Sequence, residues 1–287
     1  MKVRIAVVQD RYDVGAVEEN LAKMERAVAE DLVAEFRVKR EGRANGEEPV
    51  VSSPDSPRVY VFPELCVPGY EATPQEMGEL AEPRDGPSFR RVASMARRAS
   101  AYVVYGYAER SEDGRIYNAL QCVGPEGSSL GNYRKIHLAG AEGEVFTPGD
   151  GSVVFDTPMG RVGLMICWDL AFPELARTLA LAGAEMIWAG SAWEKSYGGP
   201  FQRFAAARAL DNTLFLAVSN QVGQPRTLDF CGDSAVYDPT GVSVTGLGEK
   251  PGLVAAWIDL ADVDRHRSHF YTMLRERRPE CYHEAVR

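Results

Sequence analysis

The chain has 287 residues, of which 45% are hydrophobic, so it can bury a sizeable core. Its formal net charge of −9 is spread without long like-charged runs, which argues against nucleic acid or an anionic membrane surface as a partner. No apolar run reaches the roughly 18 residues of a membrane-spanning helix, and the first residues start a strand pattern instead of a signal peptide. We therefore expect a cytoplasmic protein that acts on a small molecule.

Cysteine and histidine usage gives no sign of a disulfide framework or a metal site. The five cysteines are widely separated and form no Cys-x-x-Cys pair, and the four histidines form no pair with metal-binding spacing. An odd number of scattered cysteines is typical of a reduced, cytosolic protein. The sequence therefore predicts free thiols and no bound metal.

Short β-branched runs alternate with helical patterns along most of the chain. The first half predicts strands at Val3–Val8, Arg58–Phe62, Tyr102–Ala108, Tyr117–Val123 and Tyr133–Ile136, with helices from Val17 to Leu32 and at Pro87–Ala99. The second half predicts strands at Val153–Phe155, Val162–Cys167, Met186–Ala189, Leu214–Ser219, Ser234–Tyr237 and Leu253–Ile258, with helices at Pro173–Ala182 and Phe201–Asp211. This order indicates a mixed α/β fold.

One polar segment, Lys39–Pro57, interrupts the alternation and is rich in Glu, Gly, Ser and Pro. Such a composition buries little apolar surface, so we expect a surface insertion. An interdomain linker is the alternative, but about 40 preceding residues form too small a core to stand alone. We therefore expect one domain over residues 1–287, with a polar, basic tail over residues 260–287.

Cys167 is the strongest candidate for a nucleophile. It closes an apolar run that predicts a buried strand, and a helical pattern starts soon afterwards. A side chain at that junction is held by the sheet yet lies at its edge, and the following helix N-terminus favours a thiolate. A single cysteine in an apolar run is more often a small core residue. Whether Cys167 is a nucleophile therefore depends on the side chains that surround it.

Two further strand ends carry ionisable residues. Glu64 follows an apolar strand and lies among apolar neighbours, which would raise its pKa toward the range of a general base. Lys135 ends another strand, on the same alternating face as Tyr133. A surface carboxylate and a solvated ammonium are the ordinary alternatives. We expect the carboxylate, the ammonium and the thiol to converge at one sheet edge.

The sequence resembles the nitrilase superfamily of carbon–nitrogen hydrolases. The matching motifs are Phe62-Pro63-Glu64-Leu65, Tyr133 through Leu138 and Gly163 through Arg177, which occur in this order. The resemblance implies a four-layer αββα sandwich, a cofactor-free Glu-Lys-Cys triad, and a homodimer or larger homo-oligomer in which the tail 260–287 lies at an interface. In this triad, Glu64 is the general base, Cys167 the nucleophile, and Lys135 stabilises the developing charge together with the backbone N–H of Trp168.

A second active-site glutamate is common in the family, and both Glu142 and Glu144 stand at a suitable place. Glu142 fits the commoner spacing, four residues before Phe146, so we expect it to join the catalytic group. His137 is expected to make a structural hydrogen bond. The residues expected to line a substrate pocket are Tyr70, Trp168, Phe172 and Trp193, although aromatic core packing explains each of them equally well.

Within this family, a small linear amide is the first expected substrate, a carbamoyl compound the second and a nitrile the third. Cys167-Trp168-Asp169 differs from the Cys-Trp-Glu associated with true nitrilases, while Phe172-Pro173-Glu174 with Arg177 is similar to the amidase and carbamoylase groups. A catalytically silent binding or scaffold protein with the same fold is the alternative of a different class.

Overall fold

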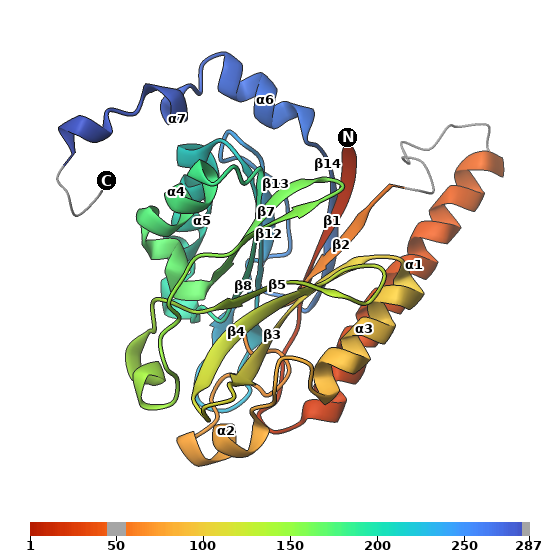
Figure 1. Ribbon diagram of the computed structural model, residues 1–287. Helices are drawn as coiled ribbons and strands as arrows, with labels where there is room; N and C mark the ends of the chain where they lie inside the picture. The colour runs from red at the N-terminus through yellow and green to blue at the C-terminus, as the bar shows by residue number, and fades with distance from the viewer. Residues whose placement is uncertain (45–55, 283–287) are drawn as a thin grey trace.

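The computed structural model describes the backbone of residues 1–44 and 56–282, and side chains for all of these except 37–44. Two six-stranded sheets form the body of the protein (Figure 1). The first has the order β14-β1-β2-β3-β4-β5, with bounds Gly252–Asp259, Lys2–Gln9, Arg58–Val61, Tyr102–Arg110, Ile116–Val123 and Ser129–Arg134. The second has the order β13-β12-β9-β8-β7-β6, with bounds Ser243–Gly246, Ala235–Tyr237, Phe215–Asn220, Met186–Ser191, Gly160–Ile166 and Val154–Thr157. Two short strands, β10 (Val222–Gly223) and β11 (Phe230–Cys231), pair separately.

The main core lies between the two sheets. Val3, Ile5 and Val7 of β1 point into it and pack in one cluster with side chains of β7 and β8, such as Leu164 and Trp188. The intervening side chains of β1 face the other way, as the two-residue period of a strand requires. Both faces of the central strands are therefore buried, which explains their nearly continuous apolar sequences.

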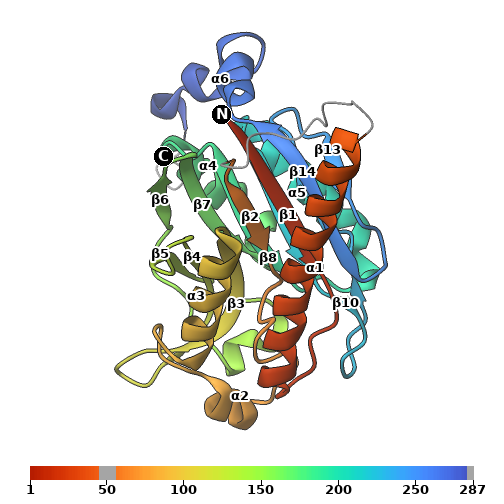
Figure 2. The same cartoon turned by 90° about the vertical axis from the view of Figure 1, so that its right-hand side faces the viewer.

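Helices cover the outer face of each sheet, so the layers follow the order helix, sheet, sheet, helix (Figures 1 and 2). Helices α1 (Val17–Ala44) and α3 (Pro87–Ala99) pack on the first sheet through Met24, Val28, Val92 and Ala96. Helices α4 (Pro173–Leu181) and α5 (Gly198–Asn212) pack on the second. The expected four-layer α/β sandwich is confirmed.

The C-terminal region contains elements that local patterns did not separate correctly. The two last predicted strands lie in different sheets: β14 pairs with β1, and β12 pairs with β13 and β9. A turn at Asp238–Gly241 leads from β12 into β13, which was not predicted. After β14 the tail forms α6 (Ala261–Ser268), α7 (Met273–Glu276) and the short helix Pro279–Cys281. Helix α6 lies at the opposite end of the sandwich from α2 (Pro74–Leu80) in both overall views.

The polar segment Lys39–Pro57 is only partly described. Helix α1 continues to Ala44, well beyond the predicted end near Leu32, so the first residues of the segment are helical. Residues 45–55 lie outside the described part of the chain, and β2 starts at Arg58. No helix among the described residues is long and apolar enough to cross a membrane.

Two glycines bring the sheets close to the backbone at Glu64. A Cβ atom on Gly106 of β3 would clash with the backbone nitrogen of Leu65 and lie 2.6 Å from the carbonyl oxygen of Pro63. A Cβ atom on Gly190 of β8 would lie 2.9 Å from the backbone nitrogen of Glu64. The Glu64 segment is therefore held between one glycine from each sheet.

We expect Gly106→Ala to destabilise the protein by about 1–3 kcal/mol, because the clash is with backbone that cannot rotate away. Hydrolytic activity should fall as well, since the displaced backbone carries Glu64. Gly78→Ala is the matched control: no atom lies within 4 Å of the added Cβ, and the site is inside helix α2. Urea unfolding of both variants checks this. Equal stability of the two would contradict the packing argument.

Candidate active site

The carboxyl ends of five strands from both sheets surround one site. Glu64 follows β2, Lys135 follows β5 directly, and Cys167 follows β7 directly. Trp193 and Gln221 come just after β8 and β9. Strands β1, β2 and β3 are parallel to one another, as are β7, β8 and β9, so side chains after their ends gather at one edge.

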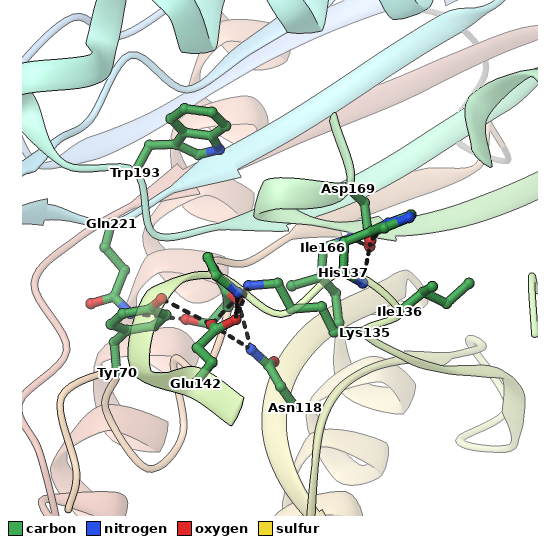
Figure 3. A network of polar contacts seen from close by, with 12 residues as sticks. Tyr70, Asn118, Lys135, Ile136, His137, Glu142, Ile166, Asp169, Trp193 and Gln221 are labelled. Atoms are coloured by element: carbon green, nitrogen blue, oxygen red, sulfur yellow. Dashed lines mark hydrogen bonds and ion pairs between the residues drawn. The ribbon is translucent and has the colours of Figure 1, made fainter. Parts of the chain in front are cut away.

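Glu64, Lys135 and Glu142 form a buried charged network, and Figure 3 shows Lys135 and Glu142 pointing toward each other with Asn118 beside them. Lys135 Nζ lies 2.6 Å from Glu64 Oε1 and 2.8 Å from both carboxylate oxygens of Glu142. Asn118 Nδ2 donates to Glu64 Oε1 at 2.7 Å and to Glu142 Oε1 at 3.3 Å. The other oxygen of Glu64, Oε2, is buried and has no hydrogen-bond partner among the described residues. One carboxylate oxygen of Glu64 is thus used for positioning, and the other is free to take a proton.

The structure distinguishes the two candidate second glutamates. Glu142 is buried, accepts a hydrogen bond from Tyr70 Oη at 2.8 Å and another from the Ala139 backbone N–H at 2.7 Å. Glu144, two residues later in the same short helix, is exposed. Only Glu142 is in contact with Lys135.

Burial sets the ionisation of this network. Removal from water raises the pKa of Glu64 to about 7; the ammonium of Lys135 opposes the rise and the carboxylate of Glu142 adds to it. Burial alone would lower the pKa of Lys135, but the charges of Glu64, Cys167 and Glu142 outweigh it and raise that pKa above its usual value. Lys135 therefore stays cationic, while Glu64 gains and loses its proton near neutral pH.

Cys167 occupies a left-handed backbone conformation, with φ +47°. It joins β7 to the short helix Cys167–Ala171, which is followed by α4. Such strain in a non-glycine residue at a strand-to-helix turn projects the side chain away from the sheet. The sulphur lies near Lys135 and Glu64, and the Ala192 backbone N–H donates to it.

The thiol of Cys167 is not held as a thiolate in the free protein. Burial, with added repulsion from Glu64, raises its pKa well above the usual value, and Lys135 only partly compensates. Desolvation therefore opposes the thiolate that the adjacent helix N-terminus is expected to favour. Glu64, whose pKa is raised to about 7, is a neighbouring group in the range that suits a general base.

Asp169 supports the turn that carries Cys167. One of its carboxylate oxygens accepts from the Ile166 backbone N–H at 2.9 Å and from Tyr133 Oη at 2.7 Å. The other accepts from the His137 backbone N–H at 3.2 Å and lies 2.8 Å from His137 Nδ1. Asp169 thereby ties the nucleophile turn to the segment around Lys135, and His137 has a structural contact.

We expect Asp169→Asn to destabilise the protein by about 1–3 kcal/mol. The asparagine NH2 group would replace one carboxylate oxygen and would then face a hydrogen-bond donor instead of accepting from it. The exposed pair partner Asp156 gives the control Asp156→Asn, for which a small change is expected. Equilibrium urea unfolding separates the two. A stability loss no larger than that of the control would argue against the bridging role of Asp169.

A cavity of about 570 Å³ opens above Cys167. Its lining comes from loops after several strands and from the start of α5: Tyr70, Leu138, Ala139, Gly140, Cys167, Trp168, Ala192, Trp193, Glu194, Tyr197, Pro200 and Phe204. Three of the four expected pocket residues, Tyr70, Trp168 and Trp193, are in this lining. Phe172 is not: its ring stacks on His137 at 3.7 Å between ring centroids and packs edge-on against Trp168.

The sequence reasoning missed three residues that hold the site together. Asn118 lies inside strand β4, and its amide joins the two glutamates. Gln221 Nε2 donates to the Glu64 backbone carbonyl at 2.8 Å, and Asp169 anchors the Cys167 turn. All three are fully or almost fully buried polar side chains, but burial of Asn118 becomes visible only when β4 is paired with its neighbours.

No group of three or more His, Cys, Asp or Glu side chains in the described part of the chain is arranged to hold a metal ion. Cys66, close to Glu64 in sequence, is also buried, and its pKa is raised to about 12 by burial. Its sulphur packs toward Met24 and the Gly106 carbonyl, away from the charged network. Among the cysteines, Cys167 alone lines the cavity.

Comparison with known proteins agrees with this arrangement. Residues 4–268 match the model of the carbon–nitrogen hydrolase family. A probable nitrilase from Schizosaccharomyces pombe is 34% identical over 98% of each chain, and an (R)-stereoselective amidase from Pseudomonas is 35% identical over 77% of this chain and 79% of its own.

Solved structures of the superfamily share the fold. A branch 10 member of the nitrilase superfamily from Saccharomyces cerevisiae has a TM-score of 0.79 at 24% identity, covering 98% of this chain and 97% of its own. An amidase from Nesterenkonia, in which acrylamide has added to the active-site cysteine, has a TM-score of 0.75 at 25% identity, covering 97% of each chain. The chain therefore belongs to the carbon–nitrogen hydrolase family of the nitrilase superfamily, and it is an enzyme of that class.

Proposed function

We propose that the protein hydrolyses a carbon–nitrogen bond of a small linear amide through a thioester on Cys167. Glu64 takes the thiol proton through its free oxygen, and the sulphur attacks the amide carbon. Lys135 and the backbone N–H of Trp168 stabilise the negative charge that develops on the carbonyl oxygen. Glu64 returns the proton to the nitrogen, the C–N bond breaks, and ammonia or an amine leaves.

The thioester is then hydrolysed. Glu64 removes a proton from a water molecule, the water oxygen attacks the thioester carbon, and the C–S bond breaks. The sulphur regains the proton, and a carboxylic acid is released. No redox step or bound cofactor is required, because the proton taken by Glu64 is returned in each half-reaction.

The observation that carries this proposal is the juxtaposition of three features at one strand edge. A strained, cavity-lining thiol at Cys167 lies beside a buried glutamate with one free oxygen. The ammonium of Lys135 is fixed by two carboxylates, so it cannot swing away from the reacting carbon. Glu142 supports the same role, since it orients Lys135 and does not itself need to reach the substrate.

The names of relatives support an amide as the first candidate substrate. Relatives include a protein named deaminated glutathione amidase at 34% identity and an omega-amidase at 30% identity, besides the probable nitrilase and the stereoselective amidase. Amidase names outnumber the others among these, which supports amide hydrolysis first. A carbamoyl substrate is second and a nitrile third. A silent binding protein would have no use for the complete charged network.

Ammonia release tests the proposal with matched panels of aliphatic amides, carbamoyl amino acids and nitriles. The wild type should act on amides, while Cys167→Ala should be inactive on every class. Cys281→Ala, which removes an exposed thiol remote from the cavity, should behave as the wild type. Intact-mass analysis of a quenched reaction should find the acyl group on Cys167. Equal rates for the wild type and Cys167→Ala would refute covalent catalysis.

We also propose that the single domain works in the cytosol as a homodimer or larger homo-oligomer, with residues 260–287 at an interface. All five cysteines are free, as a reducing compartment requires. Phe270 of the tail is 84% exposed, and Leu181 and Leu210 of α4 and α5 are also exposed. Light scattering on the wild type and on Phe270→Ser tests this, and a monomer in both cases would refute it.

A further inference from the structure

The cavity above Cys167 combines aromatic side chains with a single carboxylate in its lining. Trp168 and Trp193 lie with ring centroids 5.4 Å apart, and Trp193 lies 6.0 Å from Phe204. Glu194 is the one charged side chain in the lining, and it is half-buried. No Lys, Arg or His is in the lining.

The charged network beneath the cavity does not supply a spare cation. Lys135 is the ammonium nearest to Cys167, and both of its carboxylate partners contact it at 2.8 Å or less. The neighbouring Lys195 is exposed and pairs with Glu249 at 2.7 Å. A carboxylate on a substrate would therefore lie near Glu194, with no cationic side chain in the described lining to pair with it, which costs binding free energy.

A positively charged substrate group has two favourable partners there. Aromatic faces attract a cation through their quadrupoles, and a nearby carboxylate adds a direct ion pair. The indole N–H of Trp193 is buried without a partner among the described residues; it can donate a hydrogen bond to a substrate oxygen, but, being uncharged, it cannot neutralise a carboxylate. The cavity thus discriminates between charges of opposite sign at the end of the acyl chain.

We propose that the substrate is an amide whose acyl chain is apolar near the carbonyl and carries a protonated amino group at its far end, which Glu194 and the tryptophan faces bind. This inference rests on the amidase function proposed above and specifies its substrate class. It disfavours acyl chains with a terminal carboxylate, and with them carbamoyl amino acids, which carry a carboxylate as well.

Three amides of equal length test the inference: hexanamide, its terminal amino derivative and its terminal carboxy derivative. At neutral pH the amino derivative should have a kcat/KM at least about tenfold above that of the carboxy derivative, which corresponds to about 1.4 kcal/mol. Hexanamide provides the reference for each enzyme preparation. Glu194→Gln should reduce the ratio toward one, and Glu194→Lys should invert it. Glu112→Gln, which removes one exposed negative charge elsewhere, should keep the wild-type ratio.

The outcomes separate this inference from the amidase proposal. Hydrolysis of all three amides at similar kcat/KM, with no effect of Glu194→Gln, would overturn the inference and leave amide hydrolysis in place. If none of the three amides is hydrolysed, calorimetric titration of Cys167→Ala with the amino and carboxy derivatives tests the charge preference of the cavity directly. Preferential binding of the amino derivative, lost in Cys167→Ala/Glu194→Gln, would support the charge selection. Equal or reversed binding would refute it.

Discussion

Replacement of Glu64 by glutamine should lower kcat by about a factor of 10²–10⁴, the usual contribution of a general base. Glutamine has almost the same shape, and its oxygen can take the place of Oε1, which now accepts from Lys135 at 2.6 Å and Asn118 at 2.7 Å. Its amide nitrogen then occupies the place of the free Oε2 and cannot accept a proton. The expected result is therefore a folded protein with its network intact and its base removed.

The pH dependence gives a second readout for Glu64. Because burial raises the pKa of Glu64 to about 7, and the base must be deprotonated, kcat/KM of the wild type should rise with pH through about 7. Glu64→Gln should lose this acid limb. Glu144→Gln changes an exposed glutamate two residues from Glu142 and should keep both the rate and the limb. Initial rates of ammonia release, measured over a pH series for the wild type and both variants, test this prediction. If kcat/KM of Glu64→Gln still rose with pH through about 7, another group would be responsible for that rise.

Lys135→Met should be the most destabilising of the substitutions considered, by about 3–5 kcal/mol. The ammonium is fully buried between two carboxylates, and its removal leaves two like charges together without a counter-ion. Activity should also be lost, because the same ammonium stabilises the developing oxyanion in the proposed reaction. Chemical unfolding followed by circular dichroism measures the first effect and ammonia release the second.

The stability loss in Lys135→Met should depend on pH. The pKa of Glu64 is raised in the folded protein, so protonated Glu64 adds stability that is complete below about pH 4.5 and is lost as pH rises through about 7. Without the ammonium of Lys135, the pKa of Glu64 rises further. The loss of folding stability in Lys135→Met should therefore become smaller as the pH is lowered toward 5, where Glu64 is protonated. Lys135→Met/Glu142→Gln should recover part of the stability at neutral pH. Lys195→Met, at an exposed pair, should have little effect. A pH-independent deficit would contradict the electrostatic explanation.

Much of the fold followed from local patterns, and the exceptions have a common physical cause. Strands β1, β3, β4, β7, β8 and β9 were predicted close to their observed bounds, because two-sided burial makes them apolar along their whole length. Strand β14 was placed correctly, but its partner was not predictable, since its pairing with β1 joins residues about 250 positions apart. Local sequence contains no information on such a contact.

The candidate site was likewise predictable only where local sequence was sufficient. Glu64, Lys135 and Cys167 each follow an apolar run, so their places at strand ends were predictable from the chain. Asn118 was not, because its contact with Glu64 depends on the β4–β5 register, in which Ala119 faces Arg134 and Lys135 donates its backbone N–H to the Asn118 carbonyl. The effect of burial on the pKa of Cys167 was not predictable either, because this burial depends on both sheets together.

The carboxylate of Glu194 also affects how the proposed reaction ends. A neutral amide enters, but the acid that forms loses its proton and becomes an anion in the cavity that Glu194 lines. Like charges in a partly water-excluded cavity repel each other. Glu194 therefore weakens the binding of the ionised product, which limits its accumulation on the enzyme.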